Sequence, residues 1–306
     1  MIAVRKPGLL TTVQDMGRPG HRASGMPVAG AMDRLALAAA NRLVGNAPGA
    51  AALEFTLMGG TFGFEEGTVA ALAGAEMPAT LDGAPVGTGA KFAVPAGSTL
   101  TLGVARRGVR AYLAVAGGID VAPVLGSRST YLRAAIGGFE GRALRAGDRL
   151  PIGPPPSDGA AAPSRPLPAM PVPGSTVVLR VIPGPQDDRF AQEGLETLLA
   201  VTWKVTTLND RMGYRLEGPV VRLREGADIV TDAVVPGAVQ VSGDGQPMVL
   251  MADCQTTGGY AKPFTVIGPD LRLLAQARAG DGVRFVTCTQ EEAVAALAEE
   301  RAWPSI

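Results

Sequence analysis

A proline-rich segment in the middle of the chain limits what the polypeptide can fold into. Nine of the 24 residues from Pro151 to Gly174 are proline. Proline lacks a backbone N–H and fixes φ, so this segment can continue neither a helix nor a central strand, and it is typical of an extended linker. It therefore divides the 306 residues into a first domain at 1–150, a linker at 151–174 and a second domain at 175–306.

Both halves contain short runs with strand character, separated by many of the 41 glycines and 25 prolines of the chain. Asp82-Gly83 lies between two such runs, at 79–81 and 84–86, and predicts a two-residue β-hairpin turn. Short strands with frequent turn residues are typical of β-barrels, so the predicted fold class is mostly β. Further strands are expected at residues 100–104, 177–182, 203–205, 239–241, 248–251 and 283–286.

Few helices are expected, and they lie at the periphery. Asp33 is a candidate N-cap for a helix that continues to Leu43 and stops before Gly45. A second helix is expected at 187–200. Thr289, with Glu292 three residues later, has the pattern of a capping box that begins a third.

The tetrapeptide Arg-Ala-Gly-Asp occurs near the end of each half, at 145–148 and at 278–281, and each copy precedes apolar residues. One matching tetrapeptide is weak support for an internal duplication, because Gly-Asp is also ordinary turn chemistry. The sequence leaves both interpretations open.

Charge and composition exclude several classes of partner. The chain has 28 basic and 28 acidic residues and no basic stripe, which argues against nucleic acid as a partner. The first residues lack the apolar core of a signal peptide, and no apolar run approaches the length of a membrane span. A cytoplasmic protein with no membrane association is therefore expected, with Cys254 and Cys288 as reduced thiols.

The single histidine, His21, excludes catalytic triads and metal centres built on several imidazoles, so no metal site is expected. The sequence contains neither a Walker loop nor the glycine pattern of a dinucleotide-binding helix. It also lacks a Met-Lys-Met-like segment, so no covalently attached biotin is expected.

Three polar stretches remain as candidates for chemistry: residues 11–18 with 30–33, residues 209–215 and residues 253–260. In the last of these, two threonines and two glycines are expected to gather hydroxyl and backbone N–H groups around a phosphate or carboxylate. Arg211 and Arg215 are candidates for two-pronged contacts to the same anion, and Asp253 for proton transfer or for holding a cation. The alternative is that these stretches are an ordinary loop and a surface ion pair.

These stretches also carry a resemblance to a known family. GLLTTVQDMGRPG, GAMDRLALAAANRLVGN, YLAVAGGIDV, VLGSRST, NDRMGYRLEGP, PGAVQV and DGQPMVLMADCQTTGGY occur in this order. The chain is similar, from Gly8 to about Phe285, to the family of 5-oxoprolinase C subunits, also called KipA or biotin-dependent carboxyltransferase. It also resembles part of the carboxyltransferase region of urea carboxylase.

The resemblance implies two cyclophilin-like β-barrel subdomains with a few peripheral helices. It further implies partners, a KipI-like B subunit and a separate A subunit, with which the chain hydrolyses 5-oxoproline to glutamate at the expense of ATP. The resemblance does not say which of the three proteins binds ATP. Without a histidine-based nucleophile the chain is expected to be inactive alone.

Two alternatives from other classes stay open. One is a carboxyltransferase or allophanate-hydrolase type protein that acts on urea derivatives. The other is a non-catalytic, KipA-like regulator that binds a KipI-like kinase inhibitor.

The sequence thus predicts one site, with Asp253 and Arg211 as catalytic residues. Replacement of Arg211 by Ala, or of Thr257 by Val, is expected to reduce activity and to leave the melting temperature nearly unchanged. The residues expected to bind substrate or phosphate are Arg215, Gln255, Thr256, Thr257, Gly258, Gly259, Tyr260, Gln14 and Asp15.

Overall fold

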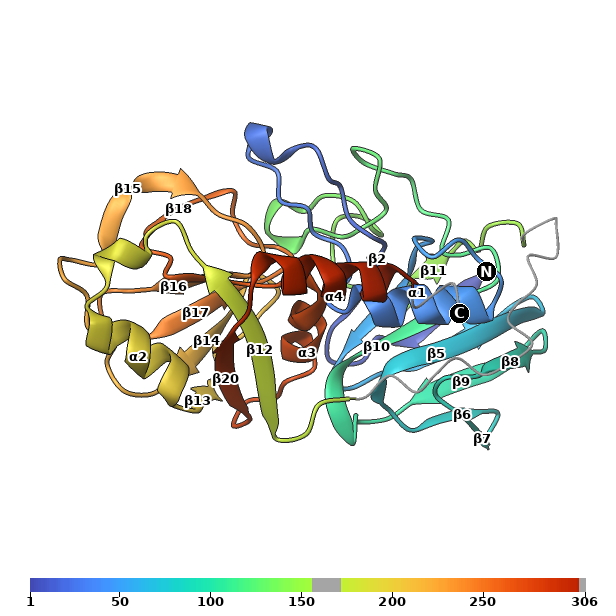
Figure 1. Ribbon diagram of the computed structural model, residues 1–306. Helices are drawn as coiled ribbons and strands as arrows, with labels where there is room; N and C mark the ends of the chain where they lie inside the picture. The colour runs from blue at the N-terminus through green and yellow to red at the C-terminus, as the bar shows by residue number, and fades with distance from the viewer. Residues whose placement is uncertain (156–171, 303–306) are drawn as a thin grey trace. The chain divides into compact units, whose positions relative to one another are not determined.

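A computed structural model describes residues 1–155 and 172–302 (Figure 1). The chain divides into two compact units, one of Met1–Arg18 with Ala29–Val172 and one of Pro19–Val28 with Pro173–Ile306. The short segment Pro19–Val28 thus belongs to the second unit, although it comes from the N-terminal half. Most of the predicted linker, residues 156–171, lies outside the described residues.

The first unit is built from two antiparallel sheets. In order, the six-stranded sheet contains β11 (Arg149–Leu150), β1 (Ile2–Lys6), β4 (Thr61–Phe64), β9 (Thr99–Leu102), β6 (Ala79–Leu81) and β7 (Ala84–Val86). In order, the five-stranded sheet contains β2 (Thr11–Gln14), β3 (Ala52–Thr56), β10 (Arg107–Val115), β5 (Thr68–Glu76) and β8 (Lys91–Val94).

Apolar side chains from both sheets form one core in this unit. The rings of Phe55 from β3 and Phe62 from β4, for example, lie 5.5 Å apart between centroids. The predicted hairpin is confirmed: Asp82 and Gly83 connect β6 to β7 with positive φ angles of 49° and 85°, as a type I′ turn requires.

The helix predicted after Asp33 is also confirmed and packs against β5 and β10 of the first unit. This helix, α1, spans Arg34–Leu43, and the Asp33 side chain accepts a 3.0 Å hydrogen bond from the Ala36 N–H. Gly45 follows the helix with a φ of 78°, a conformation that glycine adopts without strain.

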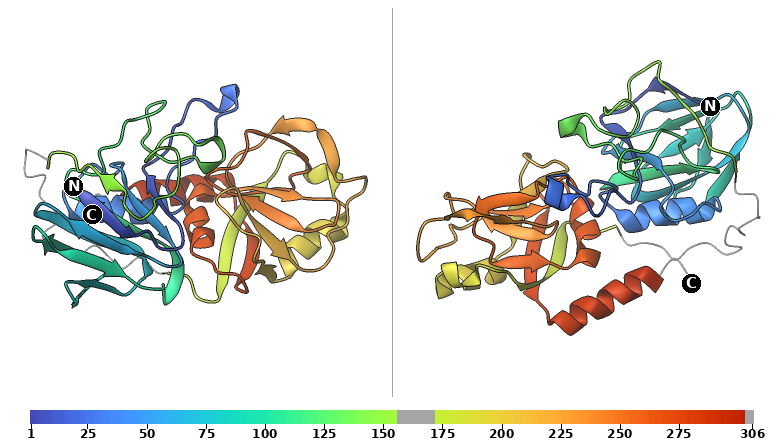
Figure 2. Two further views of the ribbon diagram at one scale, coloured as in Figure 1. Left: turned by 180° about the vertical axis from the view of Figure 1, so that it is seen from behind. Right: turned by 90° about the horizontal axis from the view of Figure 1, so that it is seen from above.

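The second unit contains a closed seven-stranded barrel. Its strands are coloured from yellow-green to red in Figure 2. Pairs within it are antiparallel except for β12 with β20, which are parallel. Inward-facing residues such as Val239, Val249 and Phe285 are at most 1% exposed. The strands, in order around the barrel, are β12 (Thr176–Pro183), β19 (Phe264–Val266), β16 (Ala238–Val241), β17 (Pro247–Leu250), β14 (Gly213–Glu217), β13 (Trp203–Val205) and β20 (Gly282–Thr287).

Two further strands of this unit, β15 (Asp228–Ala233) and β18 (Thr257–Tyr260), pair as a separate two-stranded ribbon. The mostly β fold class predicted from the sequence is confirmed. Short 3₁₀ turns lie at Arg22–Ser24 and Gly268–Asp270 in this unit and at Leu132–Ala134 in the first.

The helix predicted at 187–200 is interrupted. It consists of a 3₁₀ turn at Asp187–Arg189 and a helix α2 at Gln192–Ala200, because the buried Phe190 between them is extended and bridges to Leu223. The remaining helices are α3 (Leu271–Ala275), which was not predicted, and α4 (Gln290–Ala302). Among the helices in the described ranges, none is both long and apolar enough to cross a membrane.

The capping box before α4 is confirmed. The Thr289 N–H donates to Glu292 Oε2 at 2.8 Å, and the Glu292 N–H donates to Thr289 Oγ1 at 3.1 Å. These two bonds satisfy backbone donors that have no partner inside the helix.

The repeated Arg-Ala-Gly-Asp tetrapeptides form the same turn in both units. In each, the aspartate accepts a hydrogen bond from the backbone N–H of the arginine, at 2.7 Å for Asp148 and 2.8 Å for Asp281. The turn at 145–148 exchanges two backbone hydrogen bonds of 2.8 Å with Val4 of β1. The turn at 278–281 exchanges the equivalent two, also of 2.8 Å, with Val205 of β13. This equivalence supports the duplication that the sequence suggested.

Candidate functional site

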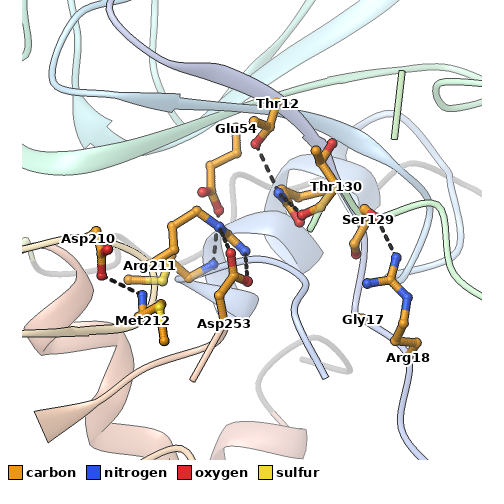
Figure 3. A network of polar contacts seen from close by, with 12 residues as sticks. Thr12, Gly17, Arg18, Glu54, Ser129, Thr130, Asp210, Arg211, Met212 and Asp253 are labelled. Atoms are coloured by element: carbon orange, nitrogen blue, oxygen red, sulfur yellow. Dashed lines mark hydrogen bonds and ion pairs between the residues drawn. The ribbon is translucent and has the colours of Figure 1, made fainter. Parts of the chain in front are cut away.

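A buried salt bridge connects two of the predicted polar stretches in the second unit. Arg211 precedes β14 and Asp253 follows β17, and the pairing of these strands extends to the Asp253 N–H, which donates to the Arg211 carbonyl at 2.8 Å. Arg211 Nε and Nη2 donate to Asp253 Oδ2 and Oδ1, each at 2.9 Å (Figure 3). The two residues are only 4% and 3% exposed.

This pair is the predicted catalytic pair, and the structure brings it together. A carboxylate that accepts two hydrogen bonds from one guanidinium is held in one orientation and fixes that guanidinium in turn. Asp253 therefore positions the Arg211 side chain.

The residues around Arg211 form a tight turn that leads into β14. Asp210 Oδ1 accepts hydrogen bonds from the N–H groups of Met212 and Gly213, at 2.7 and 3.2 Å. Asn209 Oδ1 accepts one from the Arg215 N–H at 2.7 Å. Asn209 and Asp210 thus direct the backbone so that Arg211 is buried and Arg215 is exposed.

The stretch that follows Asp253 differs from the expected anion nest. Residues 257–260 form strand β18 and pair with β15, with Thr257 opposite Ala233 and Gly258 opposite Asp232. Successive N–H groups of a strand point in opposite directions, so this backbone does not converge on one anion. Thr256 and Gln255 precede the strand and offer backbone carbonyls to Val234 and Arg22, at 3.1 and 3.2 Å.

Gly258 has a packing role instead. A Cβ atom at this position would lie 2.6 Å from Gln240 Nε2 and 3.1 Å from Val234 Cγ1. Glycine therefore lets β18 pass directly over the Gln240 side chain. This close approach, rather than anion binding, explains the glycine.

Arg215 and Tyr260 line a cavity of about 300 Å³ in the second unit. Arg215, Met248 and Gln240 are direct cross-strand neighbours on β14, β17 and β16, and therefore lie on one face of the sheet. The adjacent row of Tyr214, Val249 and Val239 is buried and fills the barrel, so the Arg215 row faces outwards. The cavity thus lies on the outer face of the barrel.

Gln240, which was not predicted from the sequence, also lines this cavity. The residue is 1% exposed, and its Nε2 and Oε1 atoms have no hydrogen-bond partner among the described residues. The only signal in the sequence was a glutamine in an otherwise apolar strand, Ala238–Val241.

An ordered carboxylate borders the same cavity. Asp244 Oδ1 accepts hydrogen bonds from Ser242 Oγ at 2.7 Å and from the Gln246 N–H at 3.0 Å. The hydrogen bond from Ser242 is the main reason why the pKa of Asp244 lies below its usual value, and Arg215 lowers it further. Asp244 is therefore ionised at neutral pH and attracts the Arg215 guanidinium.

Gln14 and Asp15 belong to the first unit, whereas the other nine predicted site residues belong to the second. Asp15 accepts hydrogen bonds from the N–H groups of Gly17 and Arg128, at 2.7 and 2.6 Å, and from the hydroxyls of Ser127 and Ser129. These bonds connect residues 15–17 to residues 127–129. Gln14 Nε2 donates to Thr12 Oγ1 at 2.9 Å and to the Thr130 carbonyl at 3.2 Å.

The second unit contains another buried cation, Lys262. It is 2% exposed, and its Nζ donates to Asp232 Oδ2 at 3.1 Å. The hydrogen bond from Lys262, followed by one from Gln186, lowers the pKa of Asp232. Lys262 therefore has an internal partner on β15 and holds this strand to the chain beyond β18.

A larger cavity of about 540 Å³ lies in the first unit, and it contains none of the predicted site residues. Among the described residues, Glu66 is the only charged one that lines it. Within residues 1–155 and 172–302, no three His, Cys, Asp or Glu side chains are placed to hold a metal ion. The cavity beside Gln240 is thus the better candidate for a specific small-molecule site.

Comparisons with known proteins agree with the resemblance seen in the sequence. The chain is 42% identical to the C subunit of 5-oxoprolinase from Escherichia coli, with 98% of this chain and 96% of the relative covered. It is 38% identical to the protein of the same name from Haemophilus influenzae, over 92% and 89% of the two chains.

Among solved structures, urea amidolyase of K. lactis superimposes with a TM-score of 0.93 at 31% identity. The match covers 99% of this chain but only 20% of that enzyme. Residues 24–287 match the family model described as the carboxyltransferase domain, subdomain A and B. The chain therefore belongs to the carboxyltransferase domain, subdomain A and B, family.

Proposed function

We propose that this chain is the C subunit of a cytoplasmic, ATP-dependent 5-oxoprolinase that hydrolyses 5-oxoproline to glutamate. The observation that carries the proposal is the likeness to the C subunit of E. coli 5-oxoprolinase along almost the whole of both chains. The chain works with a KipI-like B subunit and an A subunit, and ATP is the co-substrate of the assembled complex.

The chemistry of the reaction fits the groups that the second unit offers. Hydrolysis breaks the lactam C–N bond; water supplies a hydroxyl to the carbonyl carbon and a proton to the nitrogen. The substrate carries a carboxylate, which arginine binds well, and an amide, which needs both a hydrogen-bond donor and an acceptor. Arg215 and the Gln240 amide supply such groups on one face of the barrel.

The residues of the chain support its dependence on partner proteins. His21 is its only histidine, so an imidazole-based nucleophile system cannot be assembled from this chain alone. The isolated chain is therefore expected to show no turnover of 5-oxoproline.

Reconstitution tests this proposal. The purified chain is assayed alone and with its B and A partners for ATP hydrolysis that depends on 5-oxoproline, together with glutamate formation. Both activities are expected in the full mixture only. Full activity in a mixture that lacks this chain, or no activity in the complete mixture, would contradict the proposal.

A carboxyltransferase acting on urea is a second candidate, favoured by the TM-score of 0.93 against K. lactis urea amidolyase. The same assay separates the two proposals. Urea is offered in place of 5-oxoproline, with bicarbonate and a biotin carboxylase present. Urea-dependent ATP hydrolysis without a response to 5-oxoproline would favour the second candidate.

A further inference from the structure

Gln240 is the one buried side chain in the described part of the chain whose donor and acceptor both lack a hydrogen-bond partner. A buried amide that makes no hydrogen bond costs stability, and folded proteins rarely leave both ends unpaired. Gln240 lines the cavity, and its amide atoms are covered, so a bound molecule can supply the missing partners when β18 moves off the amide.

Three features hold the Gln240 amide at the cavity. Val239 and Val241, its neighbours on β16, are fully buried and alternate to the opposite face. Met248 lies directly opposite on β17. Gly258 passes so close to Nε2 that even a methyl group does not fit between them. The amide therefore lies at the inner end of the cavity, covered by β18.

A carboxamide presents an N–H donor and a C=O acceptor side by side. Its best partner shows an acceptor and a donor on one edge, as a cis amide does, and the two groups then form a pair of parallel hydrogen bonds. Ordinary peptide bonds are trans and carry these groups on opposite edges. A lactam is held cis by its ring, so a lactam fits the Gln240 amide.

The charged groups of the cavity further restrict which ligands can bind. Arg215 is exposed, and its guanidinium makes no hydrogen bond or ion pair with any described residue. It stands two strands from Gln240 in the same cross-strand row, roughly 10 Å away by sheet spacing. An arginine side chain can span part of this distance, so its guanidinium can bind a carboxylate on the ligand.

Acidic groups also line this cavity, and they limit the negative charge that a ligand can carry. Glu217 and Asp244 line it together with Arg215. Glu217 lies opposite Lys204 across the β13–β14 pair, and Asp244 is held by Ser242 and the Gln246 N–H. Two acidic residues beside the cavity disfavour a ligand of more than one negative charge. A compact monoanion suits the cavity.

We propose that this cavity on the outer face of the second barrel binds a lactam carboxylate, with the lactam edge on the Gln240 amide and the carboxylate on Arg215. The ligand of this class under the proposed function is 5-oxoproline, so the inference rests on that function for its natural ligand. Gln240 and Arg215 then act as positioning and binding residues, and β18 acts as the cover of the site.

Calorimetric titration of the full-length chain with four small molecules tests the recognition chemistry. L-5-oxoproline carries both the lactam and the carboxylate, 2-pyrrolidone only the lactam, L-proline only the carboxylate, and urea only a cis amide edge. We expect one site for L-5-oxoproline and affinities lower by roughly tenfold or more for the other three. Equal binding of all four, or no binding of L-5-oxoproline, would overturn the proposal.

Replacement of Gln240 by Leu separates a binding role from a structural one. The variant keeps the size of the side chain and removes two unpaired polar atoms, so its melting temperature is expected to be equal to or above that of the wild type. Its affinity for L-5-oxoproline is expected to fall at least tenfold. A clearly lower melting temperature, or unchanged affinity, would show that the amide does not serve a ligand.

Matched controls use the same replacements outside the cavity. Gln192→Leu changes an exposed glutamine on α2, and Arg284→Ala an exposed arginine on β20. Both are expected to bind L-5-oxoproline like the wild type, whereas Arg215→Ala loses at least tenfold in affinity and binds 2-pyrrolidone unchanged. An equal loss in the Arg284 variant would contradict a specific contact with Arg215.

Activity assays of the assembled complex distinguish an error in the proposed site from an error in the proposed function. Specific binding to the chain without any 5-oxoproline-dependent ATP hydrolysis by the complex would refute the function and support the site. Turnover by a complex that contains the Gln240→Leu chain with an unchanged KM would refute the site and leave the function standing.

Discussion

Arg211 and Asp253, 42 residues apart in the sequence, are joined by two parallel hydrogen bonds of 2.9 Å in the interior of the second unit. The planar guanidinium matches the two carboxylate oxygens, so the pair fixes the turn before β14 against the loop after β17. Neither residue exposes more than 4% of its surface. Each residue therefore gives the other hydrogen bonds in a place that water scarcely reaches.

Loss of either partner is expected to destabilise the protein. Arg211→Ala takes two hydrogen bonds and a neighbouring positive charge from the buried Asp253 carboxylate, and comparable losses of one partner cost about 3–5 kcal/mol. This revises the expectation from the sequence that the melting temperature stays nearly unchanged. Urea denaturation of the full chain measures the free energy of unfolding.

The control for this prediction is the double variant Arg211→Met with Asp253→Leu, which removes both charges. It is expected to be more stable than Arg211→Ala alone, because apolar side chains replace a buried ion pair at less cost than the loss of one partner. A single Arg211→Ala variant as stable as the wild type would show that the pair contributes nothing to folding. The pair would then have no role in stability.

The two cysteines are expected to differ in reactivity. Burial raises the pKa of the Cys254 thiol to about 11, so the nucleophilic thiolate is rare at pH 8. Burial also raises the pKa of Cys288, but this residue is partly exposed at the surface. Iodoacetamide at pH 8 should therefore modify Cys288 in the folded protein and Cys254 only after unfolding. Peptide mass spectrometry gives the two extents, and early modification of Cys254 would contradict this prediction.

Local turn and capping chemistry made much of the fold predictable from the sequence. Asp82-Gly83, Asp33 and Thr289 with Glu292 each act within a few residues, and their predicted roles are confirmed. The interruption at Phe190 was not predictable, because a buried contact with Leu223 overrides the helical pattern of 187–200.

The site was harder to predict because it depends on contacts that are distant in sequence. The two glycines at 258 and 259 suggested a nest, but β18 pairs with β15, and Gly258 is needed to pass over Gln240. Gln240 itself is a functional candidate only because its partners are missing, which no pattern in one sequence shows. Asp15 was singled out for its polarity, and the structure surrounds it with donors from 127–129.

Asp148 is expected to make stability dependent on acid pH. Arg142 donates two hydrogen bonds to its carboxylate, at 2.8 and 2.9 Å, and these are the main reason why the pKa of Asp148 is below its ordinary value of 3.8. A carboxyl whose pKa is lowered on folding stabilises the protein above the unfolded pKa, and this contribution disappears as pH falls through the folded pKa. The sign is therefore a loss of stability below about pH 4.

Comparison of the wild type with Asp148→Asn isolates this effect. The difference in their free energies of unfolding is expected to be constant from about pH 7 to pH 5 and to shrink below about pH 4. Asp281→Asn is the matched control, because Asp281 occupies the equivalent turn of the second unit. A difference for Asp148→Asn that does not change between about pH 7 and pH 3 would show that Arg142 does not stabilise the carboxylate.

Gly258 and Gly259 give the sharpest test of the cavity beside Gln240. An alanine Cβ at 258 would lie 2.6 Å from Gln240 Nε2, the mobile end of a side chain, so the amide must move away. At 259 the nearest atom would be the Ile229 carbonyl oxygen at 3.7 Å, an ordinary contact. Neither glycine has a positive φ, so alanine is compatible with both backbones.

Gly258→Ala is therefore expected to reduce the affinity for L-5-oxoproline by roughly tenfold, because displacement of the amide removes both hydrogen bonds to the lactam. The melting temperature should change little, since the displaced atoms make no hydrogen bonds with the described residues. Gly259→Ala should bind like the wild type. Titration calorimetry and thermal melts of the two variants provide both quantities. Equal affinities for the two variants would mean that the ligand does not rest on the Gln240 amide, whereas a loss confined to Gly258→Ala places the lactam at the Gln240 amide.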